Sequence, residues 1–449
     1  GPAIGYGSVR RLAASLLLLF LVARVLLSTL PVFVCHEMGG MHVLGPCCSS
    51  GELGLHEAPL LSARCCEQED PLKVDLMLVT HGDADHFDGL NELLKSESNA
   101  LERKRVFVAP ARYYHNGIVK RPGSKGGKKR ADVELLGETK QVGADTFITG
   151  LVEDPAALPG SERNDPFKTW VNTLATWEPR VQRVWGHAID RRRLDQTRGS
   201  AFDFLSDEGI AVDLYGPIVE DAGGVPGLRF LSEPADDANL MLGTKPAGKG
   251  GALSASHTIN GHSIAFRLRY GNVRFLLTGD LNQAAGERLR MALPNASLRC
   301  EVLKAPHHGS ADFDMEFLKE AGPVVSLISS GDENQTKEYI HPRATLLSAL
   351  GKATRTTPGV IFCTELAAFF QTLGWVDAPA KEGKTRKVFA FERTNFGIVH
   401  IRTDGDRVLA FTHSGKAGMN EAYRFTVSPT GDVVFAAAVS KVAMPPKGG

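Results

Sequence analysis

The clearest hydrophobic pattern in the first third of the chain is a short apolar run that ends abruptly in charged residues. Residues 74 to 80 read VDLMLVT, which is mostly apolar and predicts a buried strand. The polar segment HGDADH follows at 81 to 86, and the residues from Asp88 onward predict a helix. The strand therefore ends in two imidazoles and two carboxylates within six residues.

The same pattern recurs twice in the second half of the chain. Residues 257 to 280 predict two strands joined by a Tyr-Gly-Asn turn, and the second strand ends in Thr278-Gly279-Asp280. Residues 302 to 309, VLKAPHHG, predict a strand that leads to two histidines and a glycine turn. Further helices are predicted at residues 284 to 293, 315 to 322 and 342 to 352, and a further strand at 323 to 331.

The remaining segments complete a chain of mixed α/β class. Strands are predicted at 105 to 110 and 209 to 217, and mixed helix and loop over 132 to 209, including a polar helix with the sequence DRRRLDQ at 190 to 196. Beyond Cys363, short apolar runs separated by turn sequences predict a small antiparallel sheet. This tail contains no recognisable chemistry.

Residues 10 to 34 form the most apolar stretch. Two arginines precede it, as in a signal peptide or a membrane anchor, but Arg24 interrupts it, and a central arginine costs about 3 kcal/mol on membrane insertion. We expect a signal-like segment or weak anchor, with a buried helix as the alternative. Localisation stays open between the cytoplasm and a membrane-associated or exported state.

Charge and cysteine content narrow the choice of partner only slightly. The 449 residues contain 51 basic and 51 acidic side chains, so no overall charge attracts nucleic acid or acidic membrane. Any polyanion site must be local, and residues 119 to 131, VKRPGSKGGKKRA, are the candidate; the alternative is a solvated loop. The seven cysteines have no zinc-ribbon spacing.

The polar strand end at 81 to 86 is a candidate metal site. Burying unpaired charge costs several kcal/mol, whereas divalent metals bind histidine nitrogen and carboxylate oxygen. The candidate ligands are His81, Asp83, Asp85 and His86. A capping turn is the alternative. Asp280, placed after a glycine at the end of its strand, suits a ligand that bridges two metals.

These motifs resemble a known family. The HxDxDH pattern after an apolar strand is similar to the metal loop of the metallo-β-lactamase fold, in the version found in the DNA-uptake competence protein ComEC and its soluble relatives. LLTGD at 276 to 280 and LKAPHHGS at 303 to 310 resemble two further motifs of that group. The resemblance covers 74 to 90 and 256 to 365, and implies an α/β, four-layer αββα sandwich with a strand-rich C-terminal extension.

The resemblance also implies a domain organisation. Residues 35 to 362 would be the metallo-β-lactamase-like domain, with an insertion around 111 to 208 that shapes substrate access. Residues 1 to 34 would be the apolar segment and 363 to 449 the small β-rich region. Residues 35 to 73 depart from the family, because the expected Asp-Gly strand turn is not visible there.

The family motifs assign roles in the second half. His308 is the expected ligand, with His307 as a second ligand candidate or a supporting residue and Ser310 as a hydrogen-bonding residue. Asn260-Gly261-His262 leaves two alternatives open: His262 is a ligand, or it takes the place of an asparagine that hydrogen-bonds near the site. His341 is expected to face the metals as a substrate-contacting or acid/base residue.

Three strand ends that carry histidine or aspartate predict a site for two divalent metal ions, zinc or manganese. The resemblance implies hydrolysis of a phosphodiester, in DNA or RNA, with Asp280 bridging and Asp85 and His341 taking part in catalysis. Two alternatives stay open. One is a metallo-β-lactamase-fold hydrolase of a lactone or thioester, and the other is a non-catalytic binding protein. The sequence indicates no protein partner.

Overall fold

The computed structural model describes residues 19–22, 33–36, 68–102, 105–233, 251–294, 297–330, 341–379, 385–395, 398–413 and 421–436. The chain divides into two compact units. The first comprises Gly1–Arg130 and Val152–Arg193, and the second comprises Ala131–Leu151, Leu194–Gly331 and Gln335–Gly449. Both contain helices and sheets, so the α/β class is confirmed.

The first unit is built on a five-stranded sheet in the order β11-β6-β4-β1-β2. Strand β4 is central and buried along its whole length, which explains its continuous apolar run. It pairs in parallel with β6 and antiparallel with β1. The strands are β1 (Leu19–Val22), β2 (Phe33–His36), β4 (Leu76–Val79), β6 (Arg112–His115) and β11 (Asp190–Arg193); β3 (Leu72–Val74) pairs with β5 (Val108–Pro110).

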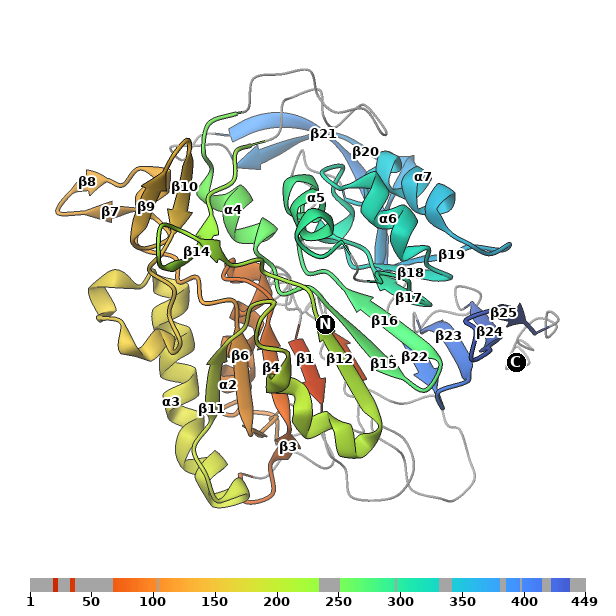
Figure 1. Cartoon of the computed structure of the whole chain (residues 1–449), viewed down its shortest axis with the longest axis horizontal. Helices are drawn as coiled ribbons and strands as arrows, with labels where there is room; N and C mark the ends of the chain where they lie inside the picture. Colours follow the sequence, from red (N-terminus) through yellow and green to blue (C-terminus); the bar gives the residue numbers. More distant parts are fainter. Residues whose placement is uncertain are drawn as a thin grey trace, which may run out of the picture. The chain divides into compact units, whose positions relative to one another are not determined.

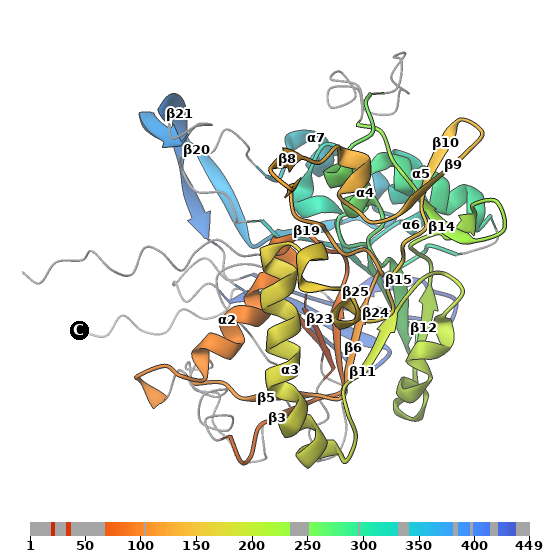
Figure 2. The same cartoon turned by 90° about the vertical axis from the view of Figure 1, so that its left-hand side faces the viewer.

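Two helices, α2 (Asp88–Ser96) and α3 (Asp165–Trp185), pack on the strands of this unit (Figure 2). The apolar side of α3 carries Trp170 and Trp177, which are fully buried in the core of the unit. The ring of Trp170 lies edge-on to Tyr113 of β6, with 5.0 Å between centroids. The helices α2 and α3 thus cover the strand that leads to residues 81 to 86.

The polar helix predicted at 190 to 196 is wrong, because Asp190–Arg193 forms strand β11 beside β6. Two of its arginines, Arg191 and Arg193, pair with residues that are distant in sequence. Arg191 donates hydrogen bonds to Asp154 and Glu178 at 3.1 and 2.6 Å. These ion pairs let a highly charged segment lie at a sheet edge, and local sequence does not reveal them.

Only part of the apolar N-terminal stretch belongs to the described residues. Leu19–Val22 forms strand β1, not a helix, and lies between β2 and β4 in the sheet. Apart from the start of β2, the rest of the apolar stretch lies outside the described residues. So do residues 37 to 67, which make up most of the divergent segment 35 to 73. Among the described residues, no helix has both the length and the apolar composition that a membrane crossing needs.

The second unit is built on a six-stranded sheet in the order β12-β15-β16-β17-β18-β19, parallel from β16 to β19 (Figure 1). The predicted pair of strands with a Tyr-Gly-Asn turn is confirmed as β15 and β16. The strands are β12 (Ile210–Leu214), β15 (Phe266–Tyr270), β16 (Val273–Leu277), β17 (Val302–Lys304), β18 (Val325–Ile328) and β19 (Val360–Cys363).

The two faces of this sheet pack against different elements, because side chains alternate along each strand. Leu276 and Leu303 share a core with the helices α5 (Gln283–Ala292), α6 (Met315–Ala321) and α7 (Ala344–Ala353), which confirms the predicted helices. Val302 and Val325 share a core with a four-stranded C-terminal sheet. That sheet contains β22 (Ile398–Thr403), β23 (Arg407–His413), β24 (Ala422–Val427) and β25 (Val433–Phe435), as the tail sequence predicts.

The second unit has three further parts. A four-stranded sheet contains β9 (Thr139–Val142), β10 (Asp145–Ile148), β13 (Glu220–Asp221) and β14 (Pro226–Arg229). A two-stranded ribbon contains β20 (Glu365–Pro379) and β21 (Thr385–Asn395). The short helix α4 (Ala255–Gly261) precedes β15 and occupies residues for which the sequence predicted a strand.

Candidate metal centre

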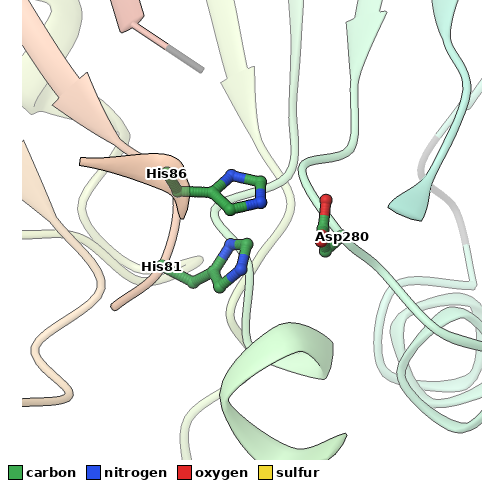
Figure 3. A group of neighbouring side chains, drawn as sticks. All are labelled: His81, His86 and Asp280. Atoms are coloured by element: carbon green, nitrogen blue, oxygen red, sulfur yellow. The ribbon is translucent and has the colours of Figure 1, made fainter. Parts of the chain in front are cut away.

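The first group of candidate ligands, in residues 81 to 86, follows β4. The chain turns at Thr80 and His81 and enters the 3-10 helix η1 (Ala84–His86). His81 and His86 are buried, and their rings lie side by side with 3.9 Å between centroids (Figure 3). The structure therefore brings together two of the predicted ligands within the first unit.

The hydroxyl of Thr80 orients both rings. Its Oγ1 lies 3.1 Å from Nδ1 of His81 and 3.4 Å from Nδ1 of His86. A hydroxyl oxygen can accept two hydrogen bonds, so both rings can carry their proton on Nδ1. In that tautomer the lone pair sits on Nε2, where a metal would bind. Thr80 was not among the residues predicted for the site, although Thr80 stands directly before His81.

The two aspartates of this loop differ. The carboxylate of Asp83 is partly exposed and forms an ion pair with Lys120 at 2.8 Å. The side chain of Asp85 lies outside the described residues, so its roles as ligand and catalytic group stay predictions. Gly82 has a packing reason for its identity, because a Cβ there would come within 2.7 Å of the Phe167 ring.

In the second unit, β16 leads into a further candidate ligand, Asp280 (Figure 3). Gly279 adopts a left-handed φ of +53°, which turns the chain at the strand end. The backbone N–H of Asp280 donates to Ser263 Oγ at 2.8 Å, and that hydroxyl donates to the carbonyl of Asn260 at 2.8 Å. The buried carboxylate of Asp280 therefore sits on a hydrogen-bonded support.

Cationic and imidazole groups surround this carboxylate. Lys304 Nζ lies 3.7 Å from Asp280 Oδ1 and donates to the carbonyl of Gly279 at 2.9 Å. His308 Nε2 lies 3.1 Å from Asp280 Oδ2. Lys304 is almost fully buried, and it was not among the residues that the sequence predicted for the site.

The two consecutive histidines have an unusual backbone conformation. Among the described residues, His307 and His308 are the only non-glycine residues with positive φ, at +48° and +50°. Each such conformation costs about 1 to 3 kcal/mol and is common at functional sites. His308 Nδ1 lies 3.2 Å from the carbonyl of Ser329, which leaves Nε2 on the side of Asp280. This pattern is typical of a histidine ligand held by a backbone carbonyl.

Two further predicted residues, Asn260 and His341, lie beside His307. Asn260 Nδ2 lies 3.2 Å from His307 Nε2, and the ring of His341 lies 6.2 Å from that of His307. Burial lowers the pKa of His307, and it lowers the pKa of His341 to about 3 with the help of the neighbouring His307 and His308. Both rings are therefore neutral at neutral pH.

Two predicted residues make contacts of a structural kind. The buried ring of His262 places Nε2 2.7 Å from the carbonyl of Arg229, and burial lowers its pKa to about 4. His262 therefore contacts the backbone of β14, and it is Asn260 of the same segment that lies beside His307. Ser310 Oγ accepts a hydrogen bond from the backbone of Asp312 at 3.2 Å and so shapes the loop.

Comparison with known proteins adds no family assignment: no protein-family model matches the chain, and no curated protein matches it. The donor groups must therefore be judged by their chemistry. Neutral imidazoles with a fixed Nδ1 and a buried carboxylate are donors that divalent zinc and manganese accept. His81, His86 and Asp280 are each buried and each offers one ligand atom.

Proposed function

We propose that the chain is a metal-dependent hydrolase of the metallo-β-lactamase type that cleaves phosphodiesters. The proposed ligands are His81 and His86 in the first unit, and Asp280 and His308 in the second. The observation that carries the proposal is the buried imidazole pair whose Nδ1 atoms share Thr80 Oγ1. Such preorganisation suits metal binding and has no evident value for packing.

The architecture of the units supports the proposed fold. An αββα sandwich needs two βα halves, and each unit supplies a mixed sheet with its own helices. The three motifs that resemble the ComEC group also follow strands β4, β16 and β17, as the family pattern requires. The C-terminal sheet on the second face of the six-stranded sheet is an extension of that plan.

A divalent ion bound by these residues supplies Lewis acidity and an activated water for attack on the phosphorus. The remaining chemistry belongs to the chain. Lys304 balances the charge of Asp280 and holds the strand end in place through the carbonyl of Gly279. His341, neutral because burial lowers its pKa to about 3, would donate a hydrogen bond to a substrate oxygen rather than act as a strong acid.

The proposal is tested by metal analysis of the purified chain together with hydrolysis of bis-p-nitrophenyl phosphate, for wild type and Asp280→Ala. Two bound ions and activity that is lost in the variant are the expected result. Bound metal without turnover would point to a lactone or thioester substrate. A chain that binds neither zinc nor manganese would contradict the proposal and favour the non-catalytic binding protein.

A further inference from the structure

The basic segment at 119 to 131, for which the sequence predicts a loop, is an ordered hairpin in the first unit (Figure 1). Strands β7 (Ser124–Lys125) and β8 (Lys128–Lys129) pair antiparallel. Gly126 and Gly127 connect them with φ values of +58° and +78°, which is typical of a two-residue hairpin turn that needs glycine. We call residues 120–130 the basic finger.

The base of the basic finger is fixed to the body of the first unit. Arg121 and Arg130 are both buried there beside Glu162. Arg121 Nη1 donates to the carbonyl of Glu162 at 2.8 Å, and Arg130 Nη2 donates to its carboxylate at 3.2 Å. The backbone N–H of Arg130 closes the base by donating to the carbonyl of Gly123 at 2.9 Å. A solvated loop would not need this anchoring.

The tip of the basic finger is exposed and positive. Every residue from 123 to 129 is exposed, in contrast to the two buried arginines that flank them. The finger contains six basic residues and no acidic one. Lys125 lies 3.3 Å from Glu162, whereas Lys128 and Lys129 extend the charge beyond the base. The finger contains no aromatic residue, so its chemistry suits a charged backbone rather than stacked bases.

The basic finger also contacts the candidate metal loop. Lys120, at its first position, pairs with Asp83 at 2.8 Å, and Asp83 lies between His81 and His86 in the chain. Lys128 lies opposite Lys125 in the hairpin, and the five residues from Lys120 to Lys125 span at most about 18 Å when fully extended. That distance corresponds to at most about five phosphates along one strand of duplex DNA. A small phosphodiester bound at the metal loop would be too short to contact the tip of the finger.

We propose that the basic finger binds the sugar–phosphate backbone of a nucleic acid whose cleavage site lies at the metal loop. The proposal rests on the proposed hydrolase function and names its substrate class. Because the finger offers lysines without aromatic side chains, binding should be electrostatic and independent of base sequence. It also explains how a chain with no net charge would attract a polyanion.

The test compares wild type with Lys128→Gln/Lys129→Gln in binding to a phosphorothioate oligonucleotide, which keeps the backbone charge and resists hydrolysis. The logarithm of the binding constant is plotted against the logarithm of the salt concentration. Loss of two phosphate contacts should reduce the steepness of that plot by about 2. The matched control is Lys319→Gln/Lys352→Gln, which removes two exposed lysines from α6 and α7.

Hydrolysis of bis-p-nitrophenyl phosphate separates this proposal from the proposed function, because that substrate cannot reach the finger. Equal activity of the finger variant and wild type, with a reduced salt slope for DNA or RNA alone, supports the proposal. An unchanged slope, or an equal change in the control variant, would overturn it while leaving the hydrolase intact. Binding of polyglutamate that is as tight as oligonucleotide binding would also overturn it.

Discussion

The candidate ligands of the two units are held in place by different means. In the first unit, one hydroxyl, that of Thr80, contacts both His81 and His86. In the second unit, the carboxylate of Asp280 lies beside the buried ammonium group of Lys304 and the ring of His308. A buried carboxylate is stabilised by such a cationic partner.

Without metal, Asp280 keeps a cationic partner in Lys304. A divalent ion would take over part of that role. The histidine pair relies instead on the Thr80 hydroxyl for its orientation.

The largest effect is expected for Asp280→Asn, which keeps the shape of the side chain and removes its charge. Hydrolysis of bis-p-nitrophenyl phosphate should fall by about a hundredfold or more in kcat/KM, because residues that only support metal ligands already cost about 10- to 100-fold. The control is Asp213→Asn, whose carboxylate pairs with Arg267 on an exposed part of β12. Wild-type activity in Asp280→Asn would show that the carboxylate takes no part in the reaction.

Lys304→Met should destabilise the metal-free chain by about 3 kcal/mol, because it leaves the buried charge of Asp280 without its ammonium partner. Addition of zinc or manganese should recover more stability in this variant than in wild type. Urea unfolding with and without metal measures both effects. Lys319→Met, at an exposed lysine of α6, is the control, and an equal metal response in both variants would refute the charge balance.

Acid should destabilise the first unit through a residue outside the candidate centre. His115 is buried with Nε2 2.9 Å from the carbonyl of Glu153, and burial lowers its pKa to about 4. As the pH falls, the unfolded chain protonates His115 near pH 6.5, whereas the folded chain protonates it only near pH 4. The free energy of unfolding should therefore fall between about pH 6.5 and 4, by up to about 3 kcal/mol, and stay constant above that range.

His115→Gln should lose less stability over the same pH interval than wild type. Urea unfolding in the presence of a chelator, at several pH values, gives the comparison. Equal losses in the variant and in wild type would mean that His115 does not contribute to the acid sensitivity.

The smallest of these effects is expected for Thr80→Val, which removes the hydroxyl shared by His81 and His86. Metal affinity should fall about 10- to 100-fold, as is typical for residues that orient ligands. Thr173→Val is a matched control, because Thr173 Oγ1 is buried in the same unit and donates to Asn91 Oδ1 at 2.8 Å. Equal metal affinity in Thr80→Val and Thr173→Val would show that the shared hydroxyl is incidental.

The elements that deliver Asp280 and the histidines could be predicted because their signals are local. Strands β4, β16 and β17 have apolar runs that end in polar residues, and α5 to α7 show helical spacing. Strand β11 could not be predicted, since its residue Arg191 pairs with Asp154 and Glu178, which come from other parts of the chain. The left-handed backbone of His307 and His308 also has no sequence signal beyond the glycine that follows.

The candidate ligands show the same limit. The sequence left open whether His262 is a ligand or takes the place of an asparagine that hydrogen-bonds near the site. Only the folding of residues 255 to 261 into α4 directs Asn260 to His307 and His262 to the carbonyl of Arg229. Lys304 was missed for the same reason, since its partner Asp280 is distant in sequence.

The central claim is that His86 and Asp280 are both ligands of divalent metal. Calorimetric titration of wild type, His86→Ala and Asp280→Asn with zinc or manganese tests it directly. Each variant should bind metal at least about tenfold more weakly than wild type, because each loses a ligand atom. Wild-type affinity and stoichiometry in either variant would contradict the claim.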